Sequence, residues 1–341
     1  MPVLIVTTEE SGVDKYSQEI AERLGVKQIA TKRYMPTMEA YRLSMLIRDE
    51  PDIVHLPNQN FARFAIFRKN PYIITVHDLV RFYHRFDPET ITEKILLRLD
   101  IMGVKRASHI IATSQHTKND LIKHMKIPGD KITVIYNGID QSIFKPYDVK
   151  LRLLDKPYVL YVGSERTRKN LDRLFEAFAM LKKEFPDLKL LKVGPVGRYD
   201  KYRRNSERKL TNLGITRDVA FIDYVSEPDL ASYYCSAMLL AYPSLYEGFG
   251  LPPLEAMACS CPVVASNTSS LPEVIGEAGI MVNPYDTDSL AQAMREVLTN
   301  SKLRDDMVRK GLEQVKKFSW ERTAKQTQEV YDRVAVGKTV Q

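Results

Sequence analysis

Short apolar runs alternate with amphipathic helical stretches along nearly the whole chain, and this alternation restricts the fold more than any other feature. In the first half, strands are predicted at Val3–Thr7, Ile53–Leu56, Tyr72–Val76, His109–Thr113 and Ile132–Ile135. In the second half, they are predicted at Tyr158–Val162, Lys189–Val193, Val219–Ile222, Met238–Tyr242 and Val263–Ala265. Helical faces between them group Val13, Tyr16, Ile20 and Leu24, and likewise Leu171, Leu174, Phe178 and Leu181. Apolar strands separated by such helices predict an α/β fold with parallel sheets covered on both faces.

The length and one polar segment predict how this fold is divided. A chain of 341 residues is typical of two domains. The stretch "FKPYDVKLRLLDKPYVLYVG" is polar, is flanked by prolines and precedes a fresh strand, which is typical of a boundary. We therefore expect two doubly wound, Rossmann-like domains, 1–150 and 151–320, which face a cleft at the carboxyl ends of their strands.

The segment "YEGFGLPPLEA", from Tyr246 to Ala256, has an unusual composition for a strand-to-helix turn. Its two glycines, Gly248 and Gly250, permit positive φ and a close approach of backbone to a ligand. Two prolines follow and suit the first turn of a helix, whose free N–H groups bind anions. Two carboxylates, Glu247 on the loop and Glu255 in the first helical turn, are placed to accept hydrogen bonds from hydroxyls on either side of a phosphate. The alternative is a glycine-rich turn with a helix-capping glutamate.

A second segment, "VGSERTRKNLDRLFEAF", also leaves a predicted strand and starts a helix, with Asn170 as the expected N-cap. Arg168 and Lys169 stand directly before that helix, where cations oppose the helix dipole by about 0.3–1 kcal/mol each. A bound diphosphate would reverse the sign of this effect. The alternative is a surface pair of cations that the fold tolerates.

Two further loops follow strands of the first domain. "TVHDLVRFY" places His77 and Asp78 at a strand end, either as a structural pair or facing the cleft. "TEESGVDKY" forms a short loop with Ser11 and Gly12 before a helix. The chain contains no G-x-G-x-x-G motif, which disfavours a nicotinamide-binding function.

Composition limits the compartment and the partners. The chain has no basic leader and no apolar run of about 20 residues, so we expect a cytoplasmic protein. Its three cysteines are expected to be reduced and buried, and no metal-ligand pattern occurs. The net charge of +7 is concentrated in Phe61–Lys126, with 12 Lys and Arg against 6 Asp and Glu. There, Ile95, Leu99 and Met102 share a helical face near Lys94, Arg98 and Lys105, which predicts contact with anionic membrane or, alternatively, a core-facing helix with a solvated side.

Together these segments resemble a known family. "YEGFGLPPLEAMACSCPVVAS" is similar to the E-x7-E signature of the retaining glycosyltransferases of family 4, which have the GT-B fold. The resemblance continues in "SSLPEVIGEAGIMVNP", "YVGSERTRKNLDRLFEAF", "TVHDL", "ATSQHTKNDL" and "VIYNGIDQSIF". "FSWERTAKQTQEVY" resembles the segment in which a closing helix, here about 321–336, returns to the first domain. Mannosyltransferase-like members are the most similar.

The resemblance implies a role for each matching position. Arg168 and Lys169 would bind the donor diphosphate, Glu255 the ribose, and Glu247 the transferred hexose, with His77 beside the reacting carbon. The other donor-binding positions would be Gly12, Gly163, Ser164, Tyr224, Val225, Gly248, Phe249, Gly250 and Leu251. Many members carry an arginine where this chain has Ser164, so the phosphate clamp would rest on Arg168 and Lys169.

The implied activity is retaining transfer of a hexose from a nucleotide sugar to the hydroxyl of a glycan or lipid-linked acceptor, without a metal or other cofactor. GDP-mannose is the favoured donor, and a UDP-hexose in a glucosyl or N-acetylhexosaminyl transferase is the alternative. A nucleotide-sugar epimerase of the same fold is a further alternative. A nucleic-acid-binding protein using the basic first half is the non-enzymatic alternative and would require a recognised binding module or interleaved aromatic residues. "FRKNPYIITVHDLVRFYHRF" has aromatic and basic residues but also reads as strand and loop of an α/β domain, so we expect no nucleic-acid partner.

Overall fold

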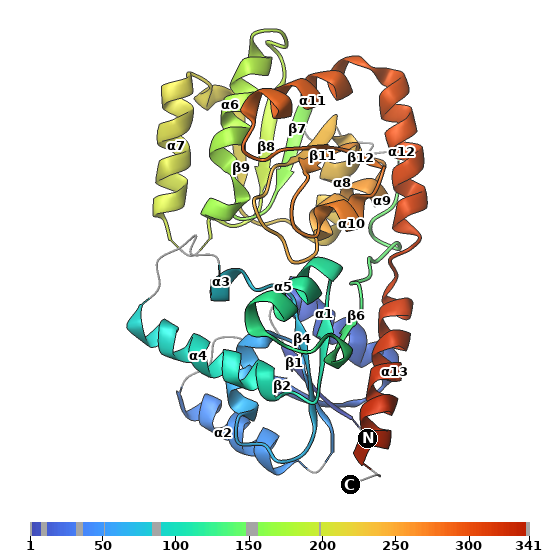
Figure 1. Cartoon of the computed structure of the whole chain (residues 1–341). Coiled ribbons are helices and arrows are strands. Elements are labelled where there is room, and N and C mark those ends of the chain that lie inside the picture. Colours follow the sequence, from blue (N-terminus) through green and yellow to red (C-terminus); the bar gives the residue numbers. More distant parts are fainter. Residues whose placement is uncertain are drawn as a thin grey trace. The chain divides into compact units, whose positions relative to one another are not determined.

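The computed structural model describes residues 2–7, 12–31, 37–50, 52–83, 90–147, 156–197 and 199–338. The chain divides into two compact units, Met1–Gly138 with Phe318–Gln341, and Ile139–Lys317. Figure 1 shows the elements of each unit. The first unit ends earlier than the predicted boundary at 150, because the segment after Gly138 belongs to the second unit. There Phe144 contacts the ring of Tyr234, and the Tyr147 hydroxyl donates to Pro228 O at 3.1 Å.

The first unit contains a parallel sheet of six strands in the order β2-β1-β3-β4-β5-β6. Its strands are β1 (Val3–Thr7), β2 (Lys27–Thr31), β3 (Val54–Leu56), β4 (Tyr72–Val76), β5 (His109–Ala112) and β6 (Ile132–Val134). Its helices are α1 (Gly12–Leu24), α2 (Thr37–Asp49), α3 (Val80–Tyr83), α4 (Ile91–Arg106), α5 (Gln115–Met125) and α13 (Trp320–Lys338), with short 3-10 turns η1 (Gln59–Ala65) and η2 (Gly129–Lys131).

The second unit contains another parallel six-stranded sheet, in the order β12-β11-β10-β7-β8-β9. Its strands are β7 (Tyr158–Val162), β8 (Lys189–Val193), β9 (Val219–Ile222), β10 (Leu239–Tyr242), β11 (Val263–Ser266) and β12 (Gly279–Val282). Its helices are α6 (Leu171–Lys182), α7 (Lys201–Leu213), α8 (Glu227–Ser236), α9 (Leu251–Ala258), α10 (Leu271–Ile275), α11 (Thr287–Thr299) and α12 (Ser301–Val315), with 3-10 turns η3 (Thr167–Lys169) and η4 (Thr216–Asp218). The predicted α/β class with two doubly wound units is confirmed.

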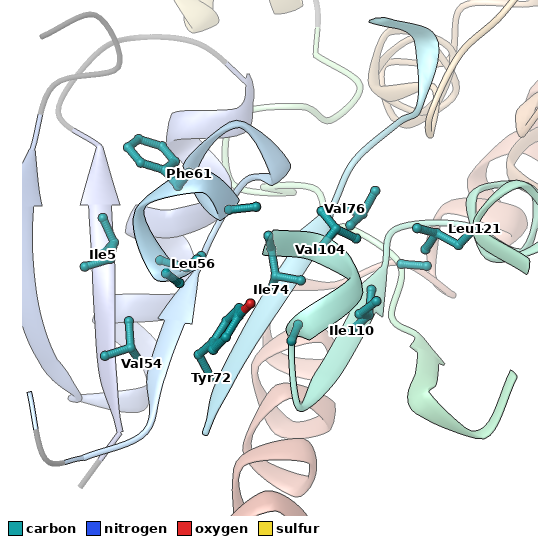
Figure 2. Close-up of a cluster of buried hydrophobic side chains, with 14 of the residues drawn as sticks. Ile5, Val54, Leu56, Phe61, Tyr72, Ile74, Val76, Val104, Ile110 and Leu121 are labelled. Atoms are coloured by element: carbon teal, nitrogen blue, oxygen red, sulfur yellow. The ribbon is translucent and has the colours of Figure 1, made fainter. Parts of the chain in front are cut away.

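Side chains that alternate along the strands of the first sheet enter two separate cores. Val3 and Ile5 face a cluster formed with α2, η1, α4 and α5, part of which is drawn in Figure 2. Leu4 and Val6 face the opposite cluster, where Tyr16 of α1 meets Trp320 of α13 at 6.2 Å between ring centroids. Because both faces are covered there, inner strands such as β1 and β4 have the continuous apolar character that parallel sheets require.

A chain of buried polar groups lies on one face of this sheet and joins α1 and α13 to it. His55 of β3 contacts the Tyr331 hydroxyl of α13 at 2.7 Å and the Thr75 hydroxyl of β4 at 2.8 Å. The Thr75 hydroxyl is in turn 2.9 Å from the Tyr16 hydroxyl of α1. Burial, with a smaller effect of His77, lowers the pKa of His55 to about 3, so the imidazole is neutral at physiological pH. The C-terminal helix is thus fixed to the first unit by satisfied hydrogen bonds as well as by apolar contact.

Gly138 lies where the chain passes the start of α13, and the space at this position excludes a side chain. A Cβ on Gly138 would stand 2.2 Å from Trp320 N. Gly138→Ala should therefore lower the free energy of unfolding by about 2 kcal/mol, because the backbone of α13 must move. Urea denaturation followed by circular dichroism measures the change.

Gly129→Ala is the matched control, because a Cβ there would meet its nearest neighbour, Ile122 Cδ1, at an ordinary 3.5 Å. Its stability should stay within about 0.5 kcal/mol of the parent. Equal urea midpoints for the two variants would contradict the close approach at Gly138.

Candidate active site

The second sheet reverses its strand order between β7 and β10. These strands pair directly, yet β7 continues toward β8 on one side and β10 toward β11 on the other. In open α/β sheets the loops that leave such a pair at their carboxyl ends diverge and bind ligands. The loop after β7 carries Arg168 and Lys169, and the loop after β10 carries Glu247. The topology therefore brings two segments that are distant in sequence to one place.

The structure joins these three predicted residues in one buried cluster. Arg168 Nη1 donates to Glu247 Oε2 at 2.9 Å, and Lys169 Nζ donates to Glu247 Oε1 at 2.6 Å. Arg168 Nη1 also donates to Tyr246 O at 2.7 Å. The side chains are 16% exposed for Arg168, 8% for Lys169 and 9% for Glu247. One carboxylate thus stands against two cations in a largely desolvated place.

The charges of the cluster perturb its titration. Burial alone would raise the pKa of Glu247, but the Arg168 and Lys169 charges outweigh burial and hold the pKa at about 2. Burial lowers the pKa of Lys169 to about 8, with Arg168 adding to this effect and Glu247 opposing it. Between these values the cluster carries two positive charges and one negative charge. The excess positive charge is available to an anionic ligand.

Two serines of the loop after β11 fix the backbone of the turn. The Ser270 hydroxyl contacts the carbonyl oxygens of Glu247 and Phe249, at 3.0 and 2.6 Å. The Glu247 N–H donates to Ser269 Oγ at 2.9 Å. Two carbonyl groups and one amide of the turn are therefore hydrogen-bonded to side chains outside it. These bonds fix the backbone that carries the Glu247 side chain.

The turn differs in two details from the sequence prediction. Gly250 has a φ of 121°, as expected, whereas Gly248 does not adopt positive φ. Helix α9 begins at Leu251, and Pro252 and Pro253 follow in its first turn, as expected. Glu255 is the fifth helical residue and therefore lies just beyond the first turn. The predicted place of Glu255 in the first turn was wrong by about one residue, because the helix starts immediately after Gly250.

Glu255 has a separate environment from the Glu247 cluster. Its Oε2 accepts a hydrogen bond from the Tyr234 hydroxyl of α8 at 2.9 Å. Tyr234 is fully buried, whereas Glu255 is half-buried. A buried phenol thus orients one end of a carboxylate that solvent reaches in part.

Asn170 occupies the N-cap position of α6, but its side chain does not cap the helix. Its Nδ2 donates instead to Pro243 O at 3.0 Å and to Pro284 O at 2.8 Å. The predicted N-cap position is confirmed, but the backbone there is left-handed, with a φ of 60°, and the side chain makes no capping hydrogen bond. Asn170 instead ties the loop after β7 to the loops after β10 and β12.

The remaining predicted positions of this unit lie at strand ends. Gly163 follows β7 with a φ of 149°, and a Cβ there would stand 2.8 Å from the Tyr161 hydroxyl. That hydroxyl donates to Ser164 O at 3.1 Å. Tyr224 and Val225 follow β9, and Tyr224 is 72% exposed. Phe249 has a buried side chain.

Two predicted residues, Gly12 and His77, belong to the first unit. Gly12 is the first residue of α1, and the loop before it, with Ser11, lies outside the described residues. His77 is buried after β4, where its Nε2 contacts Pro57 O at 2.8 Å and its ring meets that of Tyr16 at 5.1 Å. Asp78 accepts from Val80 N at 3.0 Å and starts α3.

The sequence prediction missed the residues that support the carboxylates. Tyr242 Oη lies 2.7 Å from Lys169 Nζ and 3.1 Å from Glu247 Oε1, and Tyr234 holds Glu255. Both tyrosines have the pattern of core residues, so no local signal separates them from packing. Ser269 and Ser270 stand in "SSLPEVIGEAGIMVNP", a segment that the prediction used without assigning it a contact.

In the part of the chain that the structure describes, no group of three or more His, Cys, Asp or Glu side chains is arranged to hold a metal ion. Within the same residues, no helix is long and apolar enough to cross a membrane. The three cysteines are free, with Cys259 and Cys261 buried and Cys235 half-buried.

Comparison with known proteins identifies the family. Residues 2–142 match the family model described as Glycosyltransferase Family 4, and residues 145–314 match the one described as Glycosyl transferases group 1. The chain is 31% identical to O-antigen chain mannosyltransferase B of Escherichia coli, over 94% of this chain and 86% of that protein. It is 33% identical to O-antigen chain mannosyltransferase RfbU of Salmonella typhimurium, over 66% of this chain and 60% of that protein.

Solved structures agree on the fold. Sucrose-phosphate synthase from Thermosynechococcus elongatus superimposes with a TM-score of 0.81 at 22% identity, covering 99% of this chain and 100% of that one. Anabaena HepE in complex with UDP-glucose gives a TM-score of 0.81 at 18% identity, covering 97% and 99%. With two parallel doubly wound sheets and the E-x7-E turn at a switch point, the chain belongs to glycosyltransferase family 4 and is a hexosyltransferase of the GT-B fold.

Proposed function

We propose that the protein transfers mannose from GDP-mannose to a hydroxyl of a growing glycan or lipid-linked acceptor, with retention of configuration and without a metal. The observation that carries the proposal is the buried cluster of Arg168 and Lys169 against the single carboxylate of Glu247. Mannose is favoured because relatives at 31% and 33% identity are named O-antigen chain mannosyltransferases. A UDP-hexose stays as the alternative outcome of the assay below.

Arg168 and Lys169 would act on the leaving group. As the bond from the anomeric carbon to the nucleoside diphosphate breaks, negative charge grows on the phosphate oxygens. Two fixed cations with little access to water stabilise such charge more strongly than solvent does. Their neutralising effect takes the place that a divalent cation has in metal-dependent transfer.

Glu247 would orient the hexose and take no covalent part. The anomeric carbon becomes oxocarbenium-like during transfer, as in glycoside hydrolysis. Both Glu247 oxygens are engaged by the cations, at 2.9 and 2.6 Å. When diphosphate oxygens take these cations, the carboxylate becomes available to sugar hydroxyls. His77 is proposed to lie beside the hexose, and Gly12, Tyr224 and Val225 to contact the donor.

Helix α4 supports peripheral contact with an anionic membrane. Ile91, Ile95 and Met102 are 78%, 52% and 49% exposed, and Lys94 and Arg98 are exposed on the same helix. The opposite side of α4, with Leu97, Asp100, Gly103 and Val104, is buried. Apolar side chains among exposed bases are typical of surfaces that enter the lipid interface. We therefore propose action at the cytoplasmic membrane face, where a lipid-linked acceptor would reside.

The activity is tested directly by supplying α-linked GDP-mannose, and separately UDP-glucose, together with mannose-terminated oligosaccharide acceptors. We expect GDP release and transfer from GDP-mannose to continue in EDTA, and NMR coupling constants to show an α-linked product. Restoration of a chelated enzyme by magnesium or manganese would reject the cation-clamp assignment. A β-linked product would reject retention. Transfer from UDP-glucose alone would mean that the donor is a UDP-hexose and not GDP-mannose.

The two carboxylates should separate nucleotide binding from sugar transfer. Glu255→Ala should weaken GDP binding about 10–100-fold, because a hydrogen bond to a charged group contributes roughly 1.5–3 kcal/mol. The penalty for 2′-deoxy-GDP should then largely vanish in this variant, since the partner of that hydroxyl is gone. Glu247→Gln should instead change GDP affinity only slightly, because the cations lose a competing counter-charge while Lys169 also loses the carboxylate that raises its pKa. Transfer should fall at least 100-fold, because the partner of Glu247 is on the sugar.

Isothermal titration calorimetry with GDP and 2′-deoxy-GDP measures both variants. Additive losses for Glu255→Ala and the deoxy nucleotide would mean that Glu255 does not touch the ribose. Markedly weaker GDP binding by Glu247→Gln would mean that the carboxylate supports the nucleotide instead of competing with it.

The membrane proposal predicts a salt-sensitive interaction through α4. At low salt the protein should co-float with vesicles of phosphatidylcholine and phosphatidylglycerol but not with pure phosphatidylcholine. Lys94→Glu with Arg98→Glu should reduce binding at least tenfold, since each base near the surface contributes about 1 kcal/mol. Lys302→Glu with Lys316→Glu, at exposed bases of the second unit, is the matched control. An equal loss of vesicle binding in both double variants would mean that net charge, and not the α4 surface, causes the binding.

A further inference from the structure

Tyr242 is the last residue of β10 and is held rigidly. It is 1% exposed, and its ring stacks on that of Tyr161 in β7, with centroids 6.2 Å apart and an interplanar angle of 21°. The two strands are neighbours at the point where the sheet reverses its order. A side chain fixed by both strands can hold a small group at a defined position between the two loops that follow them.

The Tyr242 hydroxyl takes part in two hydrogen bonds to charged groups of the cluster. It accepts a hydrogen bond from Lys169 Nζ at 2.7 Å and donates one to Glu247 Oε1 at 3.1 Å. Lys169 Nζ also lies 4.9 Å from the centroid of the Tyr242 ring, where the π-face attracts a cation. Burial, and then the Glu247 charge, raises the pKa of Tyr242 well above its ordinary value, so the phenol stays neutral.

We propose that Tyr242 is a positioning residue for sugar transfer, whose hydroxyl sets the Lys169 ammonium and the Glu247 carboxylate relative to each other. This inference rests on the proposed function of the cluster. A phenol can accept from an ammonium and donate to a carboxylate at once, which neither a phenylalanine nor an aliphatic side chain can do.

The hydroxyl matters most when the donor arrives. Glu247 is held by Arg168, Lys169 and Tyr242. Diphosphate oxygens compete with Glu247 for the two cations, because they are anions with the same hydrogen-bond geometry. Tyr242 is neutral, so the phosphate does not compete with Glu247 for it as it does for the two cations. It therefore keeps one Glu247 oxygen in place while the other turns to the sugar.

The same contacts predict how Tyr242 affects titration. Lys169 is faced by the charges of Glu247, Arg168 and Arg166, and by the Tyr242 hydroxyl. Glu247 is faced by Arg168, Lys169 and Tyr242, and its charge also acts on Tyr161. Removing the Tyr242 hydroxyl takes away an acceptor of the ammonium, so the pKa of Lys169 should fall below its value of about 8. Phosphate binding needs the charged lysine. As the pH is raised, binding should therefore begin to weaken at a lower pH than in the parent.

The test is Tyr242→Phe, with GDP affinity measured by calorimetry between pH 6 and pH 10, or UDP affinity if only UDP binds. In the parent, affinity should fall as pH rises above about 8, where Lys169 loses its proton. We call the pH at which affinity begins to fall the break. In Tyr242→Phe the break should lie about one pH unit lower. At pH 7 the affinity should change less than threefold, whereas kcat with the donor sugar should fall at least tenfold.

Tyr158→Phe is the matched control. Tyr158 is a buried tyrosine of β7 whose hydroxyl donates to Tyr233 O at 2.8 Å, away from the cluster. It should lower thermal stability without moving the break or kcat. The nucleotide's own titration is common to all variants and cancels in the comparison. An unmoved break in Tyr242→Phe, or the same shift in Tyr158→Phe, would overturn the inference.

A second substitution covers the case in which Tyr242→Phe does not fold. 3-Fluorotyrosine at position 242 keeps the shape of the ring but makes its hydroxyl a weaker acceptor for Lys169. The break should move in the same direction by a smaller amount, and no shift would overturn the inference. The binding readout does not require turnover. Protein that shows the shifted break but transfers no sugar would reject the proposed function alone.

Discussion

The site depends on one constraint, the pairing of a single buried carboxylate with two cations at the reversal of strand order in the second sheet. Burial makes each isolated charge unfavourable, so Arg168, Lys169 and Glu247 stabilise one another. The arrangement is nevertheless unbalanced by one positive charge. The excess positive charge favours the binding of an anion such as a diphosphate there.

The geometry of parallel sheets explains why these charges meet. Arg168 and Glu247 are 79 positions apart in the sequence, yet each follows a strand of the same neighbouring pair. The two loops are then fixed from several sides. Asn170 donates to Pro243 O and Pro284 O, Leu245 N donates to Arg168 O at 2.8 Å, and Ser270 holds the turn at Glu247. These supports are mostly hydrogen bonds to backbone, so they position the charges without adding further charge.

The sequence predicts buried features of the fold better than exposed ones. Strands covered on both faces were predicted because they are continuous apolar runs, as in Tyr72–Val76 and Tyr158–Val162. Two edge strands were missed. Lys27–Thr31 is largely exposed and polar, so it gives no apolar run. Gly279–Val282 is apolar in sequence, but it is short and only partly buried. Local patterns predicted that Arg168, Lys169 and Glu247 bind ligand, but not that they bind one another, because that contact depends on strand order.

Tyr242 shows where sequence reasoning stops for physical reasons. In "LLAYPSLYEGFG" it stands at the end of an apolar run, where a tyrosine satisfies the requirements of a core as well as those of a site. Only the fold places its hydroxyl within hydrogen-bond distance of both Lys169 and Glu247. A neutral group is required at this point, because a further cation would hold Glu247 too strongly and a further anion would cancel the positive excess. A buried phenol with a raised pKa meets both conditions and would remain uncharged during the proposed exchange of partners between the diphosphate and the carboxylate.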